Sequence, residues 1–91
     1  MQYIVCYDIS DDRRRSRAAL ALLDFGARIQ ESVFVAHLDE ELAERMRERL
    51  SRVVDPDQDR VHVFGICEAC SKRVCTMGGA PVERDPEWYV V

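Results

Sequence analysis

The sequence predicts an α+β fold, and three observations lead to this prediction. Four short segments are rich in the β-branched and aromatic residues that strands favour. Two longer segments repeat apolar residues at steps of three and four, as helices with one buried side do. The segments follow one another in the order strand, helix, strand, strand, helix, strand. This order predicts an antiparallel sheet with both helices on one face.

The first strand is predicted at residues 3–7, where tyrosine, isoleucine, valine and cysteine include no turn former. Because the run has no alternating polar residues, we expect it to be buried on both faces. The run ends at Asp8, a residue type that is depleted from strands.

The first helix is predicted at residues 13–25. Ser10, Asp11 and Asp12 precede it and offer side-chain oxygens that can cap a helix amino end. Gly26 follows it, and we expect this glycine to end the helix in the left-handed conformation. The side of the helix that we expect to be buried contains Ala18, Ala19, Leu22, Leu23 and Phe25.

The middle of the chain predicts a tight or bulged hairpin followed by the second helix. Residues 27–31 and 32–38 are two strand-like stretches with almost nothing between them. Asp39 is placed to cap the second helix. The apolar stripe of this helix is formed by Leu42, Met46, Leu50 and Val53. Two oppositely charged pairs also lie one turn apart on it, Glu41 with Arg45 and Glu48 with Arg52.

The last predicted core element is a strand at residues 60–67, which follows a proline-containing acidic turn at residues 55–59. The complete order is that of a split βαβ, ferredoxin-like domain, βαββαβ. We therefore expect residues 1–91 to be a single domain, with a core at about 1–67 and a C-terminal extension at about 68–91. The apolar end of the extension, residues 87–91, is predicted to add a short extra strand to a sheet edge, in this chain or in a partner subunit.

The length and charge of the chain limit the oligomeric states, partners and cellular locations that we expect. A domain of 91 residues can bury only a marginal core, so we expect a symmetric homodimer. A net charge of −4 argues against coating nucleic acid by bulk charge. No apolar run reaches membrane-spanning length and the amino end lacks a signal-peptide pattern, so we expect a cytoplasmic protein without a membrane partner.

Asp8 is the first candidate site residue, and two interpretations of it remain open. Its carboxylate either caps the turn after the strand or is held for a cation. One carboxylate alone makes no magnesium site, but a two-fold axis would bring a second copy of Asp8 to the same ion. Asp11 and Asp12 are further candidate ligands, although capping is the simpler role for both.

Arginines gather after Asp8, at Arg13, Arg14, Arg15 and Arg17, and twelve of the thirteen basic residues of the chain are arginine. The guanidinium group binds phosphate with two parallel hydrogen bonds, which favours nucleic acid as a partner. The same run of charges also fits a solvated helix face. Arg28 differs, because it stands at the start of a short strand with few helical partners to neutralise it.

These residues carry a resemblance to a known family. The stretch from Tyr7 to Asp12, followed by Arg15 and Arg17, and the later stretch from Arg28 to Phe34 together resemble the Cas-two family, the smaller of the two core CRISPR spacer-acquisition proteins. The similar region runs from the first to the fourth strand. Glu31 stands where many members have an aromatic residue, which argues against a base contact at that point.

The resemblance implies a ferredoxin-like homodimer in which the two Asp8 carboxylates share one Mg²⁺. It implies Asp8 as the catalytic and metal-binding residue of an endonuclease that cleaves RNA or double-stranded DNA. It also implies a complex with a dimer of the Cas-one integrase, in which the small protein helps to hold duplex DNA during spacer acquisition. The nucleic-acid-binding residues that it implies are Tyr7, Arg15, Arg17, Arg28 and Phe34.

Alternatives to this reading also fit the sequence. Tyr7 and Phe34 lie in strands, and on sequence alone they suit a sheet core or sheet face better than a nucleic-acid contact. A non-catalytic scaffold that clamps phosphate, or a toxin-like ribonuclease of related fold, would show the same residues.

The cysteines and histidines predict no further chemistry. Cys67, Cys70 and Cys75 resemble half of a zinc site, but a fourth ligand at close spacing is missing. A cytosolic setting also disfavours a redox disulfide, so we predict free thiols rather than zinc or a disulfide. His37 and His62 lie in strands and pair with no cysteine at a catalytic spacing.

Overall fold

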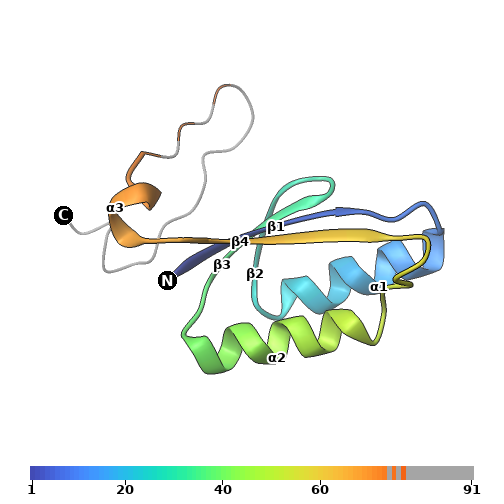
Figure 1. The fold of residues 1–91 in the computed structure, drawn as a ribbon. Helices are drawn as coiled ribbons and strands as arrows, with labels where there is room; N and C mark the ends of the chain where they lie inside the picture. Colours follow the sequence, from blue (N-terminus) through green and yellow to red (C-terminus); the bar gives the residue numbers. More distant parts are fainter. Residues whose placement is uncertain (74, 76, 78–91) are drawn as a thin grey trace.

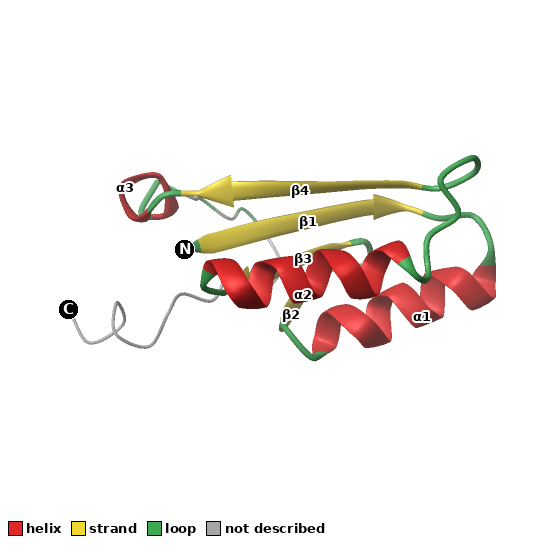
Figure 2. Cartoon of the chain, turned by 60° about the horizontal axis from the view of Figure 1, so that its bottom comes forward, coloured by secondary structure: helices red, strands yellow, loops and turns green. Residues whose placement is uncertain are grey.

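The computed structural model describes residues 1–73, 75 and 77. They form a four-stranded antiparallel sheet in the order β2-β3-β1-β4, with the two long helices packed on one face (Figure 1). Figure 2 shows these helices side by side beneath the sheet. This arrangement confirms the predicted α+β, ferredoxin-like fold. The predicted extra strand at residues 87–91 lies outside the described residues.

β1 (Gln2–Asp8) is a central strand, paired with β3 (Val33–His37) on one side and with β4 (Arg60–Ile66) on the other. Tyr3, Val5 and Tyr7 point into the core between the sheet and the helices. On the other face of β1, Ile4 and Cys6 are only half-buried and Asp8 is exposed. The expectation that β1 is buried on both faces is therefore wrong for the single chain. An apolar run alone does not reveal whether a second layer covers the far face of a sheet.

α1 (Asp12–Leu23) is capped at its amino end by Asp11, whose side chain accepts a hydrogen bond from the Arg14 N–H at 2.9 Å. Its buried residues are Ala18, Ala19, Ala21 and Leu22, and Leu23, which was expected to be buried, is instead 53% exposed. Small alanines on the buried side let the helix lie close to the sheet.

Gly26 does not have the conformation that the sequence predicted. It is the first residue of β2 (Gly26–Gln30), where it pairs with Ala36, and its φ lies outside the left-handed region. A Cβ at this position would lie 2.1 Å from the Val35 carbonyl oxygen. Glycine is required here because two backbones approach closely, and the helix ends at Asp24 with a right-handed cap.

β2 and β3 form the predicted bulged hairpin, with an irregular register between Arg28 and Gln30. α2 (Glu40–Ser51) begins at Asp39, whose carboxylate accepts a hydrogen bond from the Leu42 N–H at 2.8 Å. The predicted apolar stripe of α2 is only partly correct, because Ala43 is fully buried and Leu42 is 39% exposed.

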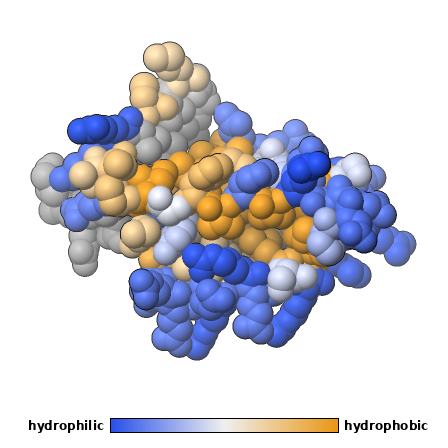
Figure 3. Space-filling view, in the orientation of Figure 1, coloured by the Kyte–Doolittle hydropathy of each residue, from blue (hydrophilic) through white to orange (hydrophobic). Residues whose placement is uncertain are grey.

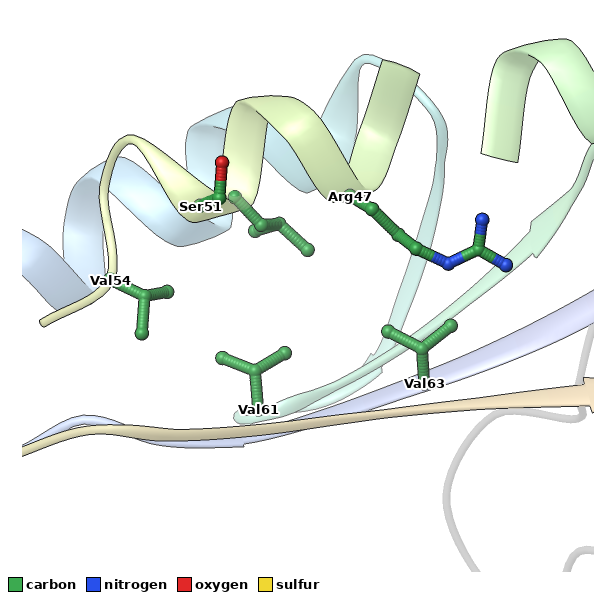
Figure 4. Close-up of a pocket in the computed structure, with 6 residues that line it drawn as sticks. Arg47, Ser51, Val54, Val61 and Val63 are labelled. Carbon is green, nitrogen blue, oxygen red and sulfur yellow. The ribbon is translucent and has the colours of Figure 1, made fainter. Parts of the chain in front are cut away.

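β4 forms one edge of the sheet, after a turn in which the Asp59 N–H donates to the Asp55 carbonyl at 2.8 Å. Val61 and Val63 face α2 and line a shallow apolar groove with Leu50 and Val54 (Figure 4). Figure 3 shows the apolar surface along this side of the molecule, with hydrophilic surface over the helices below it.

A third helix, α3 (Glu68–Ser71), follows β4 and was not predicted. It is only four residues long, and a single turn has no apolar period from which to recognise it. Across the described residues, no helix is long and apolar enough to cross a membrane.

Candidate functional site

The sheet has an open face, opposite α1 and α2, and Asp8 lies on it at the end of β1. Side chains alternate between the two faces of a strand, so Asp8 points away from the core that holds Tyr7. Its partner across the β1–β4 ladder is Arg60, the first residue of β4. Asp8 is exposed, and no hydrogen bond or ion pair joins it to another described residue. The carboxylate is therefore accessible to a cation or a ligand.

The structure shows that Asp8 does not cap α1. The N-cap of α1 is Asp11, and Asp12 forms an ion pair with Arg15. Both carboxylates are thus engaged within the first turn of α1. Neither is available as a helper ligand beside Asp8 without breaking these contacts.

The described residues of one chain do not supply a complete metal site. Among the residues that the structure describes, no group of three or more histidine, cysteine or acidic side chains is placed to hold a metal ion. Magnesium requires oxygen ligands, of which one or two carboxylates and several waters suffice. The exposed, unpaired carboxylate of Asp8 fits such a site if a second protomer brings its own copy.

Arg15 holds the loop that follows Asp8. Its Nη1 donates to the carbonyl oxygens of Ile9 at 3.1 Å and Ser10 at 3.3 Å, and its Nη2 donates to the Asp12 carboxylate. These hydrogen bonds fix the path of the chain from β1 into α1. Arg15 therefore contributes to the site chiefly by holding this loop in position.

Arg17 and its neighbour Arg13 present the free cations of α1. Both are exposed, and neither has an ion pair with another residue in the described part of the chain. Arg14, by contrast, binds the buried Asp59 carboxylate with Nε at 2.7 Å and Nη2 at 3.1 Å. Of the predicted phosphate-binding arginines on α1, Arg17 is thus the one with an uncommitted guanidinium group.

Arg28, Tyr7 and Phe34 form a cluster on the core side of the sheet. The Tyr7 and Phe34 rings stack with their centroids 6.1 Å apart, and the Arg28 guanidinium lies 5.3 Å from the Phe34 centroid. The Arg28 Nη2 donates to the Tyr7 hydroxyl at 3.4 Å, and that hydroxyl donates to the Glu31 carbonyl at 3.1 Å. Tyr7 is 5% exposed and Phe34 is fully buried. A buried ring offers no surface to a ligand, so any contribution of Phe34 to binding passes through Arg28.

Arg60 is a candidate site residue that was not predicted from the sequence. This residue is exposed and, in the described residues, has no ion pair, and it lies beside Asp8 in the sheet. The predicted topology contained the signal, because antiparallel pairing of the first and last strands places the end of one opposite the start of the other.

The exposed cysteines Cys67, Cys70 and Cys75 lie at and beyond the end of β4 and are free thiols. In the described part of the chain, these cysteines belong to no group of three or more metal-type ligands.

Comparison with known proteins adds the family. The family described as "CRISPR associated protein Cas2" matches residues 1–74. This chain belongs to the Cas2 family. The resemblance to the Cas-two family found in the sequence is confirmed.

Curated Cas2 relatives match along most or all of the chain. The "CRISPR-associated endoribonuclease Cas2 1" of Chloroflexus aurantiacus is 33% identical over 93 residues, covering 100% of both chains. The "CRISPR-associated endonuclease Cas2 2" of Thermus thermophilus is 44% identical over 64 residues, covering 70% of this chain and 71% of the relative. Relatives of this Cas2 chain are thus named as nucleases.

Solved Cas2 structures share the fold. Streptococcus pyogenes Cas2 at pH 6.5 superposes with a TM-score of 0.77 at 25% identity, covering 86% of this chain and 100% of the other. A chain of a structure titled "Partial Cas6-RT-Cas1--Cas2 complex" matches with a TM-score of 0.60 at 19% identity, covering 91% of this chain and 97% of the other, which shows the fold alone.

Proposed function

We propose that this Cas2 chain acts in CRISPR spacer acquisition as a homodimer that binds duplex nucleic acid, and that its two Asp8 residues form a magnesium-dependent phosphodiesterase site. The observation that carries the proposal is the placement of Asp8. Its carboxylate is exposed, unpaired among the described residues, and adjacent to Arg60 on a face that the two long helices leave open. Membership in a family whose relatives are named as endonucleases supports the activity.

The open face supports the homodimer. It carries the half-buried Ile4, Cys6 and Val33, and Phe64 on β4 is 52% exposed. Apolar groups on one sheet face gain free energy when a second layer covers them. Two copies packed through this face would bring Asp8 near its own copy, because a two-fold axis pairs each residue near it with itself.

The chain's own groups have distinct tasks in this proposal. Asp8 of each protomer would hold Mg²⁺, and Arg15 would keep the loop after Asp8 in place through the Ile9 and Ser10 carbonyls. Bound magnesium would supply an activated water and stabilise the charge that develops on the phosphate. Arg60 and Arg17 would neutralise backbone phosphates of the substrate. Either RNA or double-stranded DNA presents the phosphodiester that this arrangement requires.

Arg28 is the third proposed phosphate contact. Tyr7 and Phe34 hold its guanidinium at the sheet edge by a hydrogen bond and a ring contact. Preorganising an exposed arginine in this way reduces the side-chain entropy lost on binding. Tyr7 and Phe34 would thereby support nucleic-acid binding from within the core.

A Cas1 partner is part of the same proposal. Membership in the Cas2 family supports it, because the resemblance to that family implies a complex with the integrase in spacer acquisition. Co-purification of the two proteins from one cell, with and without duplex DNA, tests the association. A Cas2 dimer that never enters a complex with Cas1 in the presence of DNA would contradict this part of the proposal.

A second candidate function is a non-catalytic scaffold, and one observation favours it. A single chain places only one carboxylate at the site and, in its described residues, no cluster of metal ligands. Binding of labelled duplex DNA, measured by fluorescence anisotropy with magnesium and then with chelator, tests the binding role that both candidates share. Binding that is absent in both conditions would contradict both of them.

A further inference from the structure

The segment that follows β4 holds two cysteines that neither the fold nor the proposed nuclease site uses. Cys67 is the N-cap residue immediately before α3, and Cys70 lies three positions later in the same turn. Both thiols are exposed. The turn is closed by Ser71, which is buried and whose N–H donates to the Cys67 carbonyl at 2.9 Å.

The backbone of this turn has the spacing that a disulfide needs. Residues three positions apart in a helical turn have Cα atoms about 5 Å apart. Disulfides form between Cα atoms separated by about 4.4–6.8 Å. Cys67 and Cys70 could therefore be joined without moving β4 or breaking its pairing with β1.

The two thiols already interact and differ in character. The Cys70 N–H and the Cys70 thiol donate hydrogen bonds to the Cys67 sulfur, and these bonds lower the pKa of the Cys67 thiol. The same contact raises the pKa of the Cys70 thiol, because Cys70 acts as the donor and then faces a negative sulfur. A thiol with a lowered pKa is the more reactive one at neutral pH. This asymmetry marks Cys67 as the attacking sulfur and Cys70 as the resolving one.

We propose that Cys67 and Cys70 are a reversible dithiol–disulfide pair that exchanges electrons with low-molecular-weight disulfides. The other cysteines are poorly placed for this reaction. Cys6 lies four residues from Gln2, the residue opposite Ile66, so it is about 13 Å along the sheet from the end of β4. Cys75 lies outside the turn, four residues beyond the end of α3.

The reaction balances as an ordinary thiol–disulfide exchange. The Cys67 thiolate attacks one sulfur of the small disulfide, forms a mixed disulfide and releases the first small thiolate. The Cys70 thiolate then attacks the Cys67 sulfur, forms the Cys67–Cys70 bond and releases the second small thiolate. The pair loses two electrons and two protons, and the small disulfide becomes two thiols. The product is a closed ring at the junction between the sheet and the C-terminal extension.

Oxidised glutathione is the probe that tests this proposal. The full-length protein is equilibrated with mixtures of reduced and oxidised glutathione, quenched with acid, alkylated and analysed by mass spectrometry. We expect an intramolecular bond that maps to Cys67 and Cys70 in mixtures that leave Cys6 and Cys75 reduced. Cys67 should also be alkylated several-fold faster than Cys75 at neutral pH.

Matched variants assign the roles. Cys70→Ser should trap one glutathione on Cys67, because the resolving thiol is gone, whereas Cys67→Ser should trap none. Cys6→Ser and Cys75→Ser should behave as the wild type does. A bond formed instead with Cys75, equal trapping in the Cys67 and Cys70 variants, or one zinc per purified chain that either variant abolishes would overturn the proposal.

Discussion

Asp8 and Arg60 face each other across the pairing of β1 with β4, as the last residue of one strand and the first of the other, on the sheet face opposite the two long helices. This places a carboxylate and a guanidinium group side by side at one corner of the sheet. Neither forms an ion pair with any described residue, so both are available to a ligand. A metal-binding acid beside a phosphate-binding base is the arrangement that phosphodiester chemistry uses.

Arg60→Ala should weaken binding to duplexes of unrelated sequence to a similar degree. Removing one phosphate contact should make the slope of log K against log salt shallower by about 0.9. Anisotropy titrations at several salt concentrations measure this slope. Arg45→Ala is the matched control, because Arg45 is already paired with Glu41 at 3.0 Å. Equal slopes for the Arg60 variant and the wild type would remove Arg60 from the binding surface.

Phe64→Glu should convert the proposed dimer to monomer, because it places a charge on the exposed apolar part of the open face. Sedimentation of the variant and the wild type at micromolar concentration measures this change. Leu20→Glu provides the control, since Leu20 is 66% exposed on α1, away from that face. A dimer that survives the Phe64 change but not the Leu20 change would place the interface on the helices.

Gly26→Ala should destabilise the fold by about 3 kcal/mol, because the added Cβ would collide with the Val35 carbonyl oxygen 2.1 Å away. Gly65→Ala is a sharp control. Its Cβ would meet the Met1 sulfur at 3.3 Å and the Tyr3 ring at 3.4 Å, both side-chain atoms that can move. Urea unfolding of both variants checks the difference, and similar losses in the two would show that close backbone approach is not what selects Gly26.

Asp59→Asn should destabilise the protein at neutral pH and make little difference in acid. The hydrogen bonds from Arg14 lower the pKa of Asp59, so the folded state favours the ionised carboxylate. That stabilisation is complete above the unfolded pKa of about 3.9 and is lost as the pH falls through the lower folded value. Urea midpoints of wild type and variant should therefore converge below about pH 4. A gap that stays constant from neutral pH into acid would contradict this role for the ion pair.

The sequence was sufficient to predict the architecture because each element has its own local signal. Asp39 and Asp11 stand where helix caps belong, and the order of strands leaves few topologies. The wrong predictions have one physical cause. A local sequence pattern does not show which residues, distant in the sequence, pack against a given position. Gly26 follows a helix and suits a left-handed cap, yet the nearness of Val35 decides its role. Leu42 fits the helical period of α2, yet it is 39% exposed and the neighbouring Ala43 is fully buried instead.

The candidate site was only partly predictable for the same reason. Asp8 was recognisable because an acid at the end of an apolar strand is unusual. The partners that distinguish one arginine from another lie far away in the sequence, as Asp59 does from Arg14. The difference between Arg14, which is committed to the fold, and Arg17, which is free for a ligand, therefore emerges only in three dimensions.

Asp8→Asn is the change that separates nuclease from scaffold. The amide keeps the shape of the side chain and removes the charge that magnesium requires. Because Asp8 caps no helix and its carboxylate forms no hydrogen bond or ion pair with a described residue, the variant should fold, keep the proposed dimer and still bind duplex.

The decisive measurement is magnesium-dependent cleavage of RNA and duplex DNA by wild type and Asp8→Asn, purified side by side, with a chelator lane for each. A shared site at the two Asp8 residues predicts cleavage by wild type in magnesium, none in chelator, and a loss of at least about a hundredfold in the variant. Cleavage that persists in the Asn variant, or that proceeds equally in chelator, would contradict it.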